Sequence, residues 1–161
     1  MDLTSFTGKS PSKKKEYFDS DEIKNLAEKI IEEQHLDIKP AEVGYLIVSP
    51  YISKTIPSKT LKCSPELKHF SGLDYIIQIS QELWLSLEPA DKNVLLFHEL
   101  MKIMPVMNDK TGEYDMRLRP PDMYGFSKVI NQYGSEWRKR IVLCLSSLYN
   151  FSANQEDKVK I

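Results

Sequence analysis

The chain has 161 residues, which is enough for one domain with a substantial core and too few for two. Its 22 basic and 23 acidic residues nearly cancel, so no overall field favours nucleic acid or a membrane surface as a partner. The apolar runs fall far short of the roughly 20 residues that cross a bilayer, and no apolar signal-peptide core follows the start. We therefore expect a soluble, intracellular protein of the cytoplasm with reduced cysteines at Cys63 and Cys144.

The two ends of the chain differ in composition from its middle. Residues 1–19 are rich in Ser, Thr and Lys and lack apolar periodicity, which predicts a flexible arm. Residues 20–151 are expected to form a single domain, and residues 152–161 a polar tail. The run from Lys13 to Lys15 is a candidate contact for nucleic acid, but short charged runs of this kind are usually solvated.

Hydrophobic spacing in the first half of the domain predicts a helix followed by a short sheet. Ser20 is a suitable N-cap for a helix with apolar residues at helical spacing to about Gln34. Lys39 and Pro40 interrupt that pattern. The elements expected next are strands at Val43–Val48, Lys59–Cys63 and Asp74–Ser80, with a helical turn at Pro65–Phe70.

The second half is expected to be mainly helical. Pro89 and Asp91 suit the first turn of a helix that is expected to run to about Met104. The elements expected after it are a polar turn at residues 108–112, an edge strand at Tyr114–Leu118, a helix from Arg119 to about Gly134 and a last helix at Glu136–Phe151. Together these elements predict an α+β domain, in which a short mixed sheet packs against the Pro89 helix and against N- and C-terminal helices.

The segment from His98 to Lys102 reads HELMK, the H-E-x-x-H motif of zinc proteases with its second histidine replaced by lysine. In the intact motif, two imidazoles one helical turn apart hold Zn²⁺ and the glutamate activates the bound water. A protonated Lys102 offers no free lone pair and would repel a divalent cation. The segment therefore indicates either an enzyme or the remains of one.

His98, Glu99 and Lys102 share one arc of the expected helix, opposite a broad apolar side. This pattern predicts that the helix buries its apolar side and presents His98 and Glu99 to a cleft or to water. Any surface helix would show the same pattern, so periodicity alone leaves a functional and a structural role open. The other two histidines, His35 and His69, are solitary and are expected at the surface.

Several spaced blocks between Val43 and Gly134 carry a family resemblance. They are Tyr45–Val48, Pro65–Leu67, Gly72–Ile77, Trp84 with Leu87, His98–Leu100, the turn Asp109–Gly112, Arg117 with Leu118, and Asp122 with Phe126 ahead of Tyr133 and Gly134. In their order and their amino-acid sequence these blocks resemble the Putative phage metallopeptidase family, over somewhat more than half of the chain. The resemblance implies a phage protein with a small zincin-like fold.

In that family the active helix ends as H-E-L-x-H, and a third ligand lies in a later H-D-x-x-x-F segment. The resemblance places His98 at the first zinc ligand, Glu99 at the general base and Lys102 at the second ligand. It places Pro121 at the third ligand, with Asp122 in the acidic position beside it. Because two of three ligands are replaced, no cofactor is expected. Lys102 is expected to contact Glu99 instead of a metal, the alternative being a solvated lysine without a fixed partner.

The leading hypothesis is a catalytically inactive, metallopeptidase-like phage protein that binds a protein partner, such as a host factor or defence component that it inhibits. The candidate contact surfaces are the expected cleft around His98, Glu99 and Lys102, the basic residues Arg138–Arg140, and the arm. The alternative is an active zinc-dependent metallopeptidase with unconventional ligands, such as His98 with Asp115 or Asp122, or with a ligand from a partner chain. A third hypothesis, nucleic-acid binding through the arm, requires a strongly salt-dependent affinity. The sequence leaves the partner's identity and the oligomeric state open.

Overall fold

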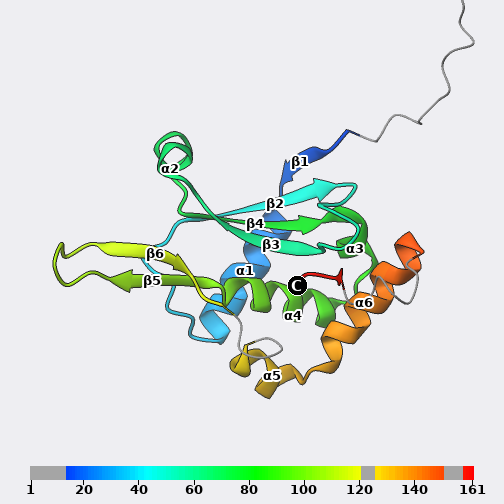
Figure 1. Ribbon diagram of the computed structural model, residues 1–161. Helices are drawn as coiled ribbons and strands as arrows, with labels where there is room; N and C mark the ends of the chain where they lie inside the picture. The colour runs from blue at the N-terminus through cyan, green and yellow to red at the C-terminus, as the bar shows by residue number, and fades with distance from the viewer. Residues whose placement is uncertain (1–13, 121–125, 151–157) are drawn as a thin grey trace, which may run out of the picture.

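A four-stranded sheet organises the described part of the chain, residues 14–120, 126–150 and 158–161, in the computed structural model (Figure 1). Its strands lie in the order β1 (Glu16–Asp19), β2 (Val43–Ser49), β4 (Tyr75–Ser80) and β3 (Ser58–Lys62). The central strands β2 and β4 are parallel, whereas β1 and β3 run antiparallel to their neighbours. One edge of the mixed sheet is therefore β3.

The register of β3 on β4 decides which of its side chains face the core. In β4, Tyr75, Ile77 and Ile79 are fully buried and alternate with less buried residues, as the period of two in a strand requires. Ser58 lies opposite Ile79, and Thr60 lies opposite Ile77. Because directly opposed residues point to the same face of a sheet, both hydroxyl side chains point into the core.

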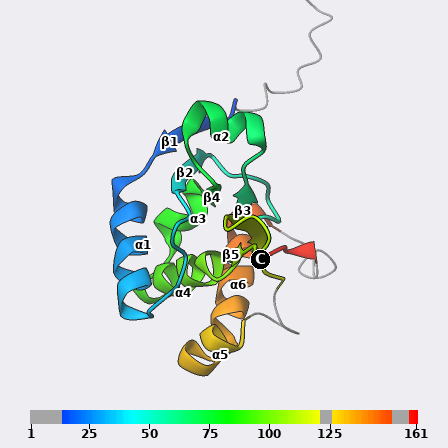
Figure 2. The same cartoon turned by 90° about the vertical axis from the view of Figure 1, so that its left-hand side faces the viewer.

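Two long helices pack with these strands in one core. The first, α1 (Asp21–Glu33), begins after Ser20, whose hydroxyl accepts a hydrogen bond from the amide of Ile23 at 3.2 Å. The buried side of α1 carries Ile23, Ala27 and Ile30, and the helix contacts α4 (Pro89–Leu100). Figures 1 and 2 show α4 lying beneath the sheet with α1 to one side of it. The helix that carries the HELMK segment is thus central to the fold.

The remaining elements flank this core. They are α2 (Pro65–Ser71), α3 (Gln81–Ser86), α5 (Ser127–Tyr133), α6 (Glu136–Tyr149) and the hairpin of β5 (Ile103–Met107) with β6 (Tyr114–Leu118). Helix α6 contacts both α3 and α4, and Arg140 Nη2 lies 2.9 Å from Oδ1 of Asp91, a residue only 7% exposed at the start of α4. The hairpin projects away from the sheet (Figure 1).

The α+β class expected from the sequence, with its short mixed sheet, is confirmed, whereas the zincin-like assignment stays a prediction. The expected helix end at Met104 is wrong, because α4 ends at Leu100 and β5 follows. The carbonyl of Lys102 accepts a hydrogen bond from the amide of Arg119 at 2.8 Å, so pairing with the returning chain replaces the helical ladder. No helix within the described ranges is long and apolar enough to cross a membrane.

Both ends of the described chain contribute more to the domain than composition suggests. Strand β1 lies within residues 1–19, the expected arm, and pairs with β2 from Glu16 opposite Ser49 to Asp19 opposite Leu46. Within residues 152–161, the expected polar tail, Val159 is buried at 7% exposure. In each case the partner is distant in sequence, which composition does not reveal.

Candidate functional site

The HELMK segment forms the end of α4 and the turn that follows it, directly against the edge strand β3. His98 and Glu99 are both fully buried, each with 0% exposure. The expectation that they face a cleft or water is therefore wrong. Glu99, on the polar arc of α4, can be buried because the inward-facing hydroxyls of β3 supply its carboxylate with hydrogen-bond partners.

The Glu99 carboxylate has hydrogen-bond donors at both of its oxygens. Ser58 Oγ donates to Oε1 at 2.8 Å, and Thr60 Oγ1 donates to Oε2 at 2.7 Å. The ammonium of Lys102 lies 2.9 Å from each of the two oxygens. Since a carboxylate offers about four lone-pair positions, these four contacts use its accepting capacity. The geometry makes Glu99 a satisfied core residue.

Lys102 supplies the charge that balances this carboxylate. Its side chain is 18% exposed, whereas that of Glu99 is 0% exposed, so the ion pair lies between the core and the surface. A carboxylate that is buried without a cation costs several kcal/mol. The predicted contact between Glu99 and Lys102 is present in the structure, and the alternative of a solvated lysine without a fixed partner is wrong.

His98 lies on the other side of the same turn, among aromatic rings. Its ring centroid is 5.2 Å from that of Phe126 and 5.2 Å from that of Trp137 on α6. Within the described residues, neither of its ring nitrogens has a hydrogen-bond partner. Burial lowers the pKa of His98 to about 4, although the neighbouring Glu99 carboxylate opposes the shift. The imidazole is therefore neutral at pH 7.

Of the other residues singled out from the sequence, those that the structure describes lie away from this turn. Pro121 and Asp122 lie outside the described residues. Asp115 is exposed on β6, where its carboxylate lies 3.9 Å from the guanidinium of Arg117. No group of three or more His, Cys, Asp or Glu side chains that could hold a metal ion occurs in the described part of the chain. His35 and His69 are exposed, as expected.

Ser58 and Thr60 are the site residues that sequence reasoning missed. They precede Glu99 by 41 and 39 positions, and no local pattern links them to it. A weak signal was available, because Ser58 and Thr60 are alternate residues in a segment expected to be a strand and so share one face. The signal does not identify the buried face, which depends on the pairing of β3 with β4.

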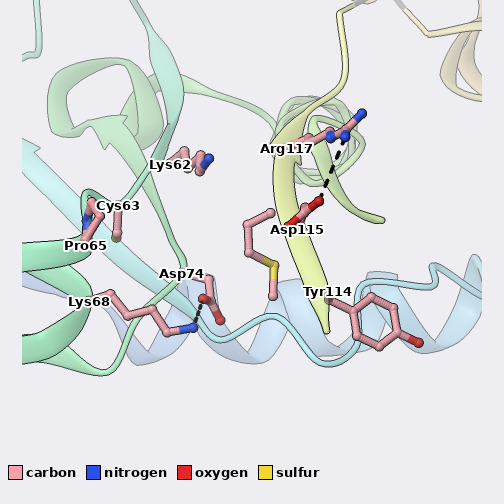
Figure 3. A pocket seen from close by; sticks show the side chains of 9 residues that line it. Lys62, Cys63, Pro65, Lys68, Asp74, Tyr114, Asp115 and Arg117 are labelled. Carbon is pink, nitrogen blue, oxygen red and sulfur yellow. Dashed lines mark hydrogen bonds and ion pairs between the residues drawn. The ribbon is translucent and has the colours of Figure 1, made fainter. Parts of the chain in front are cut away.

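A separate hollow lies at the end of β3, between α2 and the hairpin strand β6 (Figure 3). It encloses about 500 Å³, and no residue of α4 lines it. The lining contains two ion pairs, one between Lys68 and Asp74 and one between Arg117 and Asp115. These pairs largely neutralise the charge of its lining, and the hollow does not extend the Glu99 site.

Comparison with known proteins adds one match. The family model described as Putative phage metallopeptidase matches residues 15–143, which is most of the chain. No curated protein and no solved structure matches it. The matched range contains every strand of the described residues, and it contains His98, Glu99 and Lys102. The chain therefore belongs to the Putative phage metallopeptidase family.

Proposed function

We propose that this chain is a metallopeptidase-like pseudoenzyme of a phage that acts by binding another protein, such as a host factor that it inhibits. The observation that carries the proposal is the position of the Lys102 ammonium, 2.9 Å from both oxygens of Glu99. The family resemblance assigns Glu99 the role of general base. A base must keep a lone pair for the proton of the attacking water, and Glu99 already accepts four contacts from three donor groups, Ser58, Thr60 and Lys102.

The described residues do not fit a catalytic zinc. Such a site needs three protein ligands and one position for water. In the HELMK turn the second ligand position holds Lys102, whose ammonium has no lone pair and carries a charge of the same sign as the metal. His98 alone would leave most of the hydration cost of Zn²⁺ uncompensated. With Lys102 at one ligand position and His98 as a lone ligand, we expect metal-dependent hydrolysis to be lost.

Protein binding is proposed because a fold retains its packing after its chemistry is lost. The ion pair of Glu99 keeps the polar arc of α4 compatible with a stable core, so the scaffold does not depend on a metal. We place the intracellular host factor first among partner classes, since the family is a phage family. The nearly balanced charge of the chain gives no support to nucleic acid or a membrane as the main partner.

The first experiment measures metal and activity together. Protein purified without a histidine tag and dialysed is expected to contain far less than one zinc per chain and to leave peptide substrates uncut. Added chelator is expected to leave its thermal unfolding unchanged. A stoichiometric zinc content, with peptide cleavage that Glu99→Gln abolishes, would overturn the inactive assignment.

The second experiment tests binding. The chain is immobilised and exposed to lysate of host cells, and captured proteins are identified by mass spectrometry and then purified. Reconstitution from the purified components is expected to give a complex of fixed stoichiometry that Glu99→Gln leaves intact. Failure of every captured protein to bind the purified chain would contradict the proposed role.

One observation favours the alternative of an active zinc enzyme with unconventional ligands. Both ring nitrogens of His98 lack a partner within the described residues, and a neutral imidazole is the form that binds zinc. Asp122 is the remaining candidate ligand named from the sequence and lies outside those residues. In that case Asp122→Ala would release zinc that the unaltered chain holds, which metal analysis detects directly.

A further inference from the structure

The segment Lys158–Ile161 follows α6 in the sequence. It lies against α4 and the turn before β3, which are both far from it in the sequence (Figure 1). Its side chains alternate in burial. Val159 is 7% exposed and Ile161 is half-buried, whereas Lys158 and Lys160 are exposed. This alternation is typical of an extended segment with one face on the protein. Val159 joins the same core cluster as Trp137 and Phe126, and Ile161 packs against that cluster.

The backbone of the segment is attached to the turn that leads into β3. The amide of Lys160 donates a hydrogen bond to the carbonyl of Thr55 at 2.8 Å. The turn is itself ordered by a bridge between Ser53 and Ile56 and by a hydrogen bond from the Thr55 amide to Ser53 Oγ at 3.3 Å. Two residues beyond this turn, Ser58 binds Glu99. The segment is therefore anchored beside the polar site.

The end of the segment reaches His98. The backbone of Ile161 lies close enough to the imidazole to favour its protonated form, against the larger effect of burial, without forming a full hydrogen bond to either ring nitrogen. The same imidazole contacts the rings of Phe126 and Trp137. The backbone of Ile161 and the two rings thus lie beside His98, whose exposure is 0%.

We propose that Lys158–Ile161 is a removable cover of the His98 site, held in cis, whose departure exposes the imidazole and the adjoining surface of Trp137. Within the described residues, the segment makes one backbone–backbone hydrogen bond to the rest of the domain, and two apolar side chains provide its packing. A segment with so few contacts opens at a smaller free energy than the whole domain. The proposal concerns access to the site and holds whether or not the chain binds another protein.

The test compares the same new charge at a buried and at an exposed position of the segment. Val159→Asp places a carboxylate where the side chain is 7% exposed, whereas Lys160→Asp places it on the exposed side. Diethyl pyrocarbonate labels accessible, unprotonated imidazoles, and mass spectrometry resolves each site. His98 is expected to be labelled about tenfold faster in Val159→Asp than in the unaltered chain or in Lys160→Asp. The exposed His35 and His69 serve as internal references whose rates stay constant.

Equal labelling of His98 in all three folded proteins would overturn the cover. Circular dichroism establishes whether Val159→Asp is folded. If it is unfolded, native-state hydrogen exchange on the unaltered chain tests whether the segment opens separately from the domain. The amide of Lys160 is then expected to exchange through a local opening, well before the amides of Leu96 and Phe97 in the core of α4. Exchange of all three amides at one common free energy of opening would show that the segment does not leave separately.

Discussion

Replacing Lys102 by methionine would remove the ammonium from the Glu99 site while keeping most of the length and apolar contact of the side chain. Removing one partner of a fully buried ion pair costs about 3–5 kcal/mol. The Glu99 side chain is 0% exposed, but that of Lys102 is 18% exposed, so solvent screens part of the interaction. We therefore expect the free energy of unfolding to fall by about 2–3 kcal/mol at pH 7. For a domain of this size the midpoint of thermal unfolding would fall by roughly 4–12 °C.

The chain provides a matched control for this substitution. Lys139 and Glu136, in α6, are also three residues apart, with Nζ 3.3 Å from Oε1, but their side chains are 73% and 66% exposed. Lys139→Met is expected to change the free energy of unfolding by less than about 0.5 kcal/mol. The two variants lose the same kind of charge at the same sequence spacing. The difference between them therefore isolates the effect of burying the carboxylate.

The assay is equilibrium urea unfolding, followed by the fluorescence of the buried Trp84 and Trp137. Glu99→Gln in the Lys102→Met background removes the unpaired charge and keeps an amide that can bond to β3. A double-mutant cycle is expected to give a coupling of about 1–2 kcal/mol between the two residues. If Lys102→Met were as stable as Lys139→Met, the inference that the ammonium neutralises a buried carboxylate would be refuted.

Three further outcomes are expected. The unfolded chain binds more protons than the folded one between pH 6.5 and about 4, because burial lowers the pKa of His98 from 6.5 to about 4. The free energy of unfolding should therefore fall as the pH drops through this window, by at most about 3 kcal/mol, and His98→Gln should flatten the dependence in urea titrations. Lys102→His combined with Pro121→His should acquire zinc affinity, measured by metal analysis and calorimetry, and an unchanged metal content would count against the inherited ligand positions. Arg140→Met should cost about 1–2 kcal/mol because it leaves the carboxylate of Asp91, 7% exposed, without its guanidinium, and an unchanged urea midpoint would contradict this.

The sequence was sufficient for the features that depend on local spacing. Alternation and capping predicted β2, β4, β6 and the start of α1, and the three-residue spacing on a helix predicted the contact of Lys102 with Glu99. The end of α4 could not be obtained in this way. The apolar periodicity continues past Leu100. The chain turns into β5 where the amide of Arg119 donates a hydrogen bond to the carbonyl of Lys102, and these residues are 17 positions apart in the sequence.

The burial of the polar arc on α4 could not be predicted from the sequence either, for a related reason. Periodicity identifies which residues share a face, but not what that face meets. A face with His98 and Glu99 suggests water or a cleft when the helix is considered alone. The actual surroundings are two hydroxyls from an edge strand and rings from a different helix, contacts that exist only once the sheet and α6 are assembled. The same limit applies to Val159, which composition placed in a polar tail.

The environment of Glu99 links the proposed loss of chemistry to the stability of the domain. A carboxylate at 0% exposure persists only if its charge and its lone pairs are matched, and the structure matches them with Lys102, Ser58 and Thr60. In a metal site the cation itself would supply the compensating charge, so a ligand could not be lost without leaving the glutamate uncompensated. Under the proposed function, Lys102 replaces that charge with one that is covalently attached. The domain can therefore keep the buried glutamate and its fold without depending on a metal, at the expense of the free lone pair that catalysis requires.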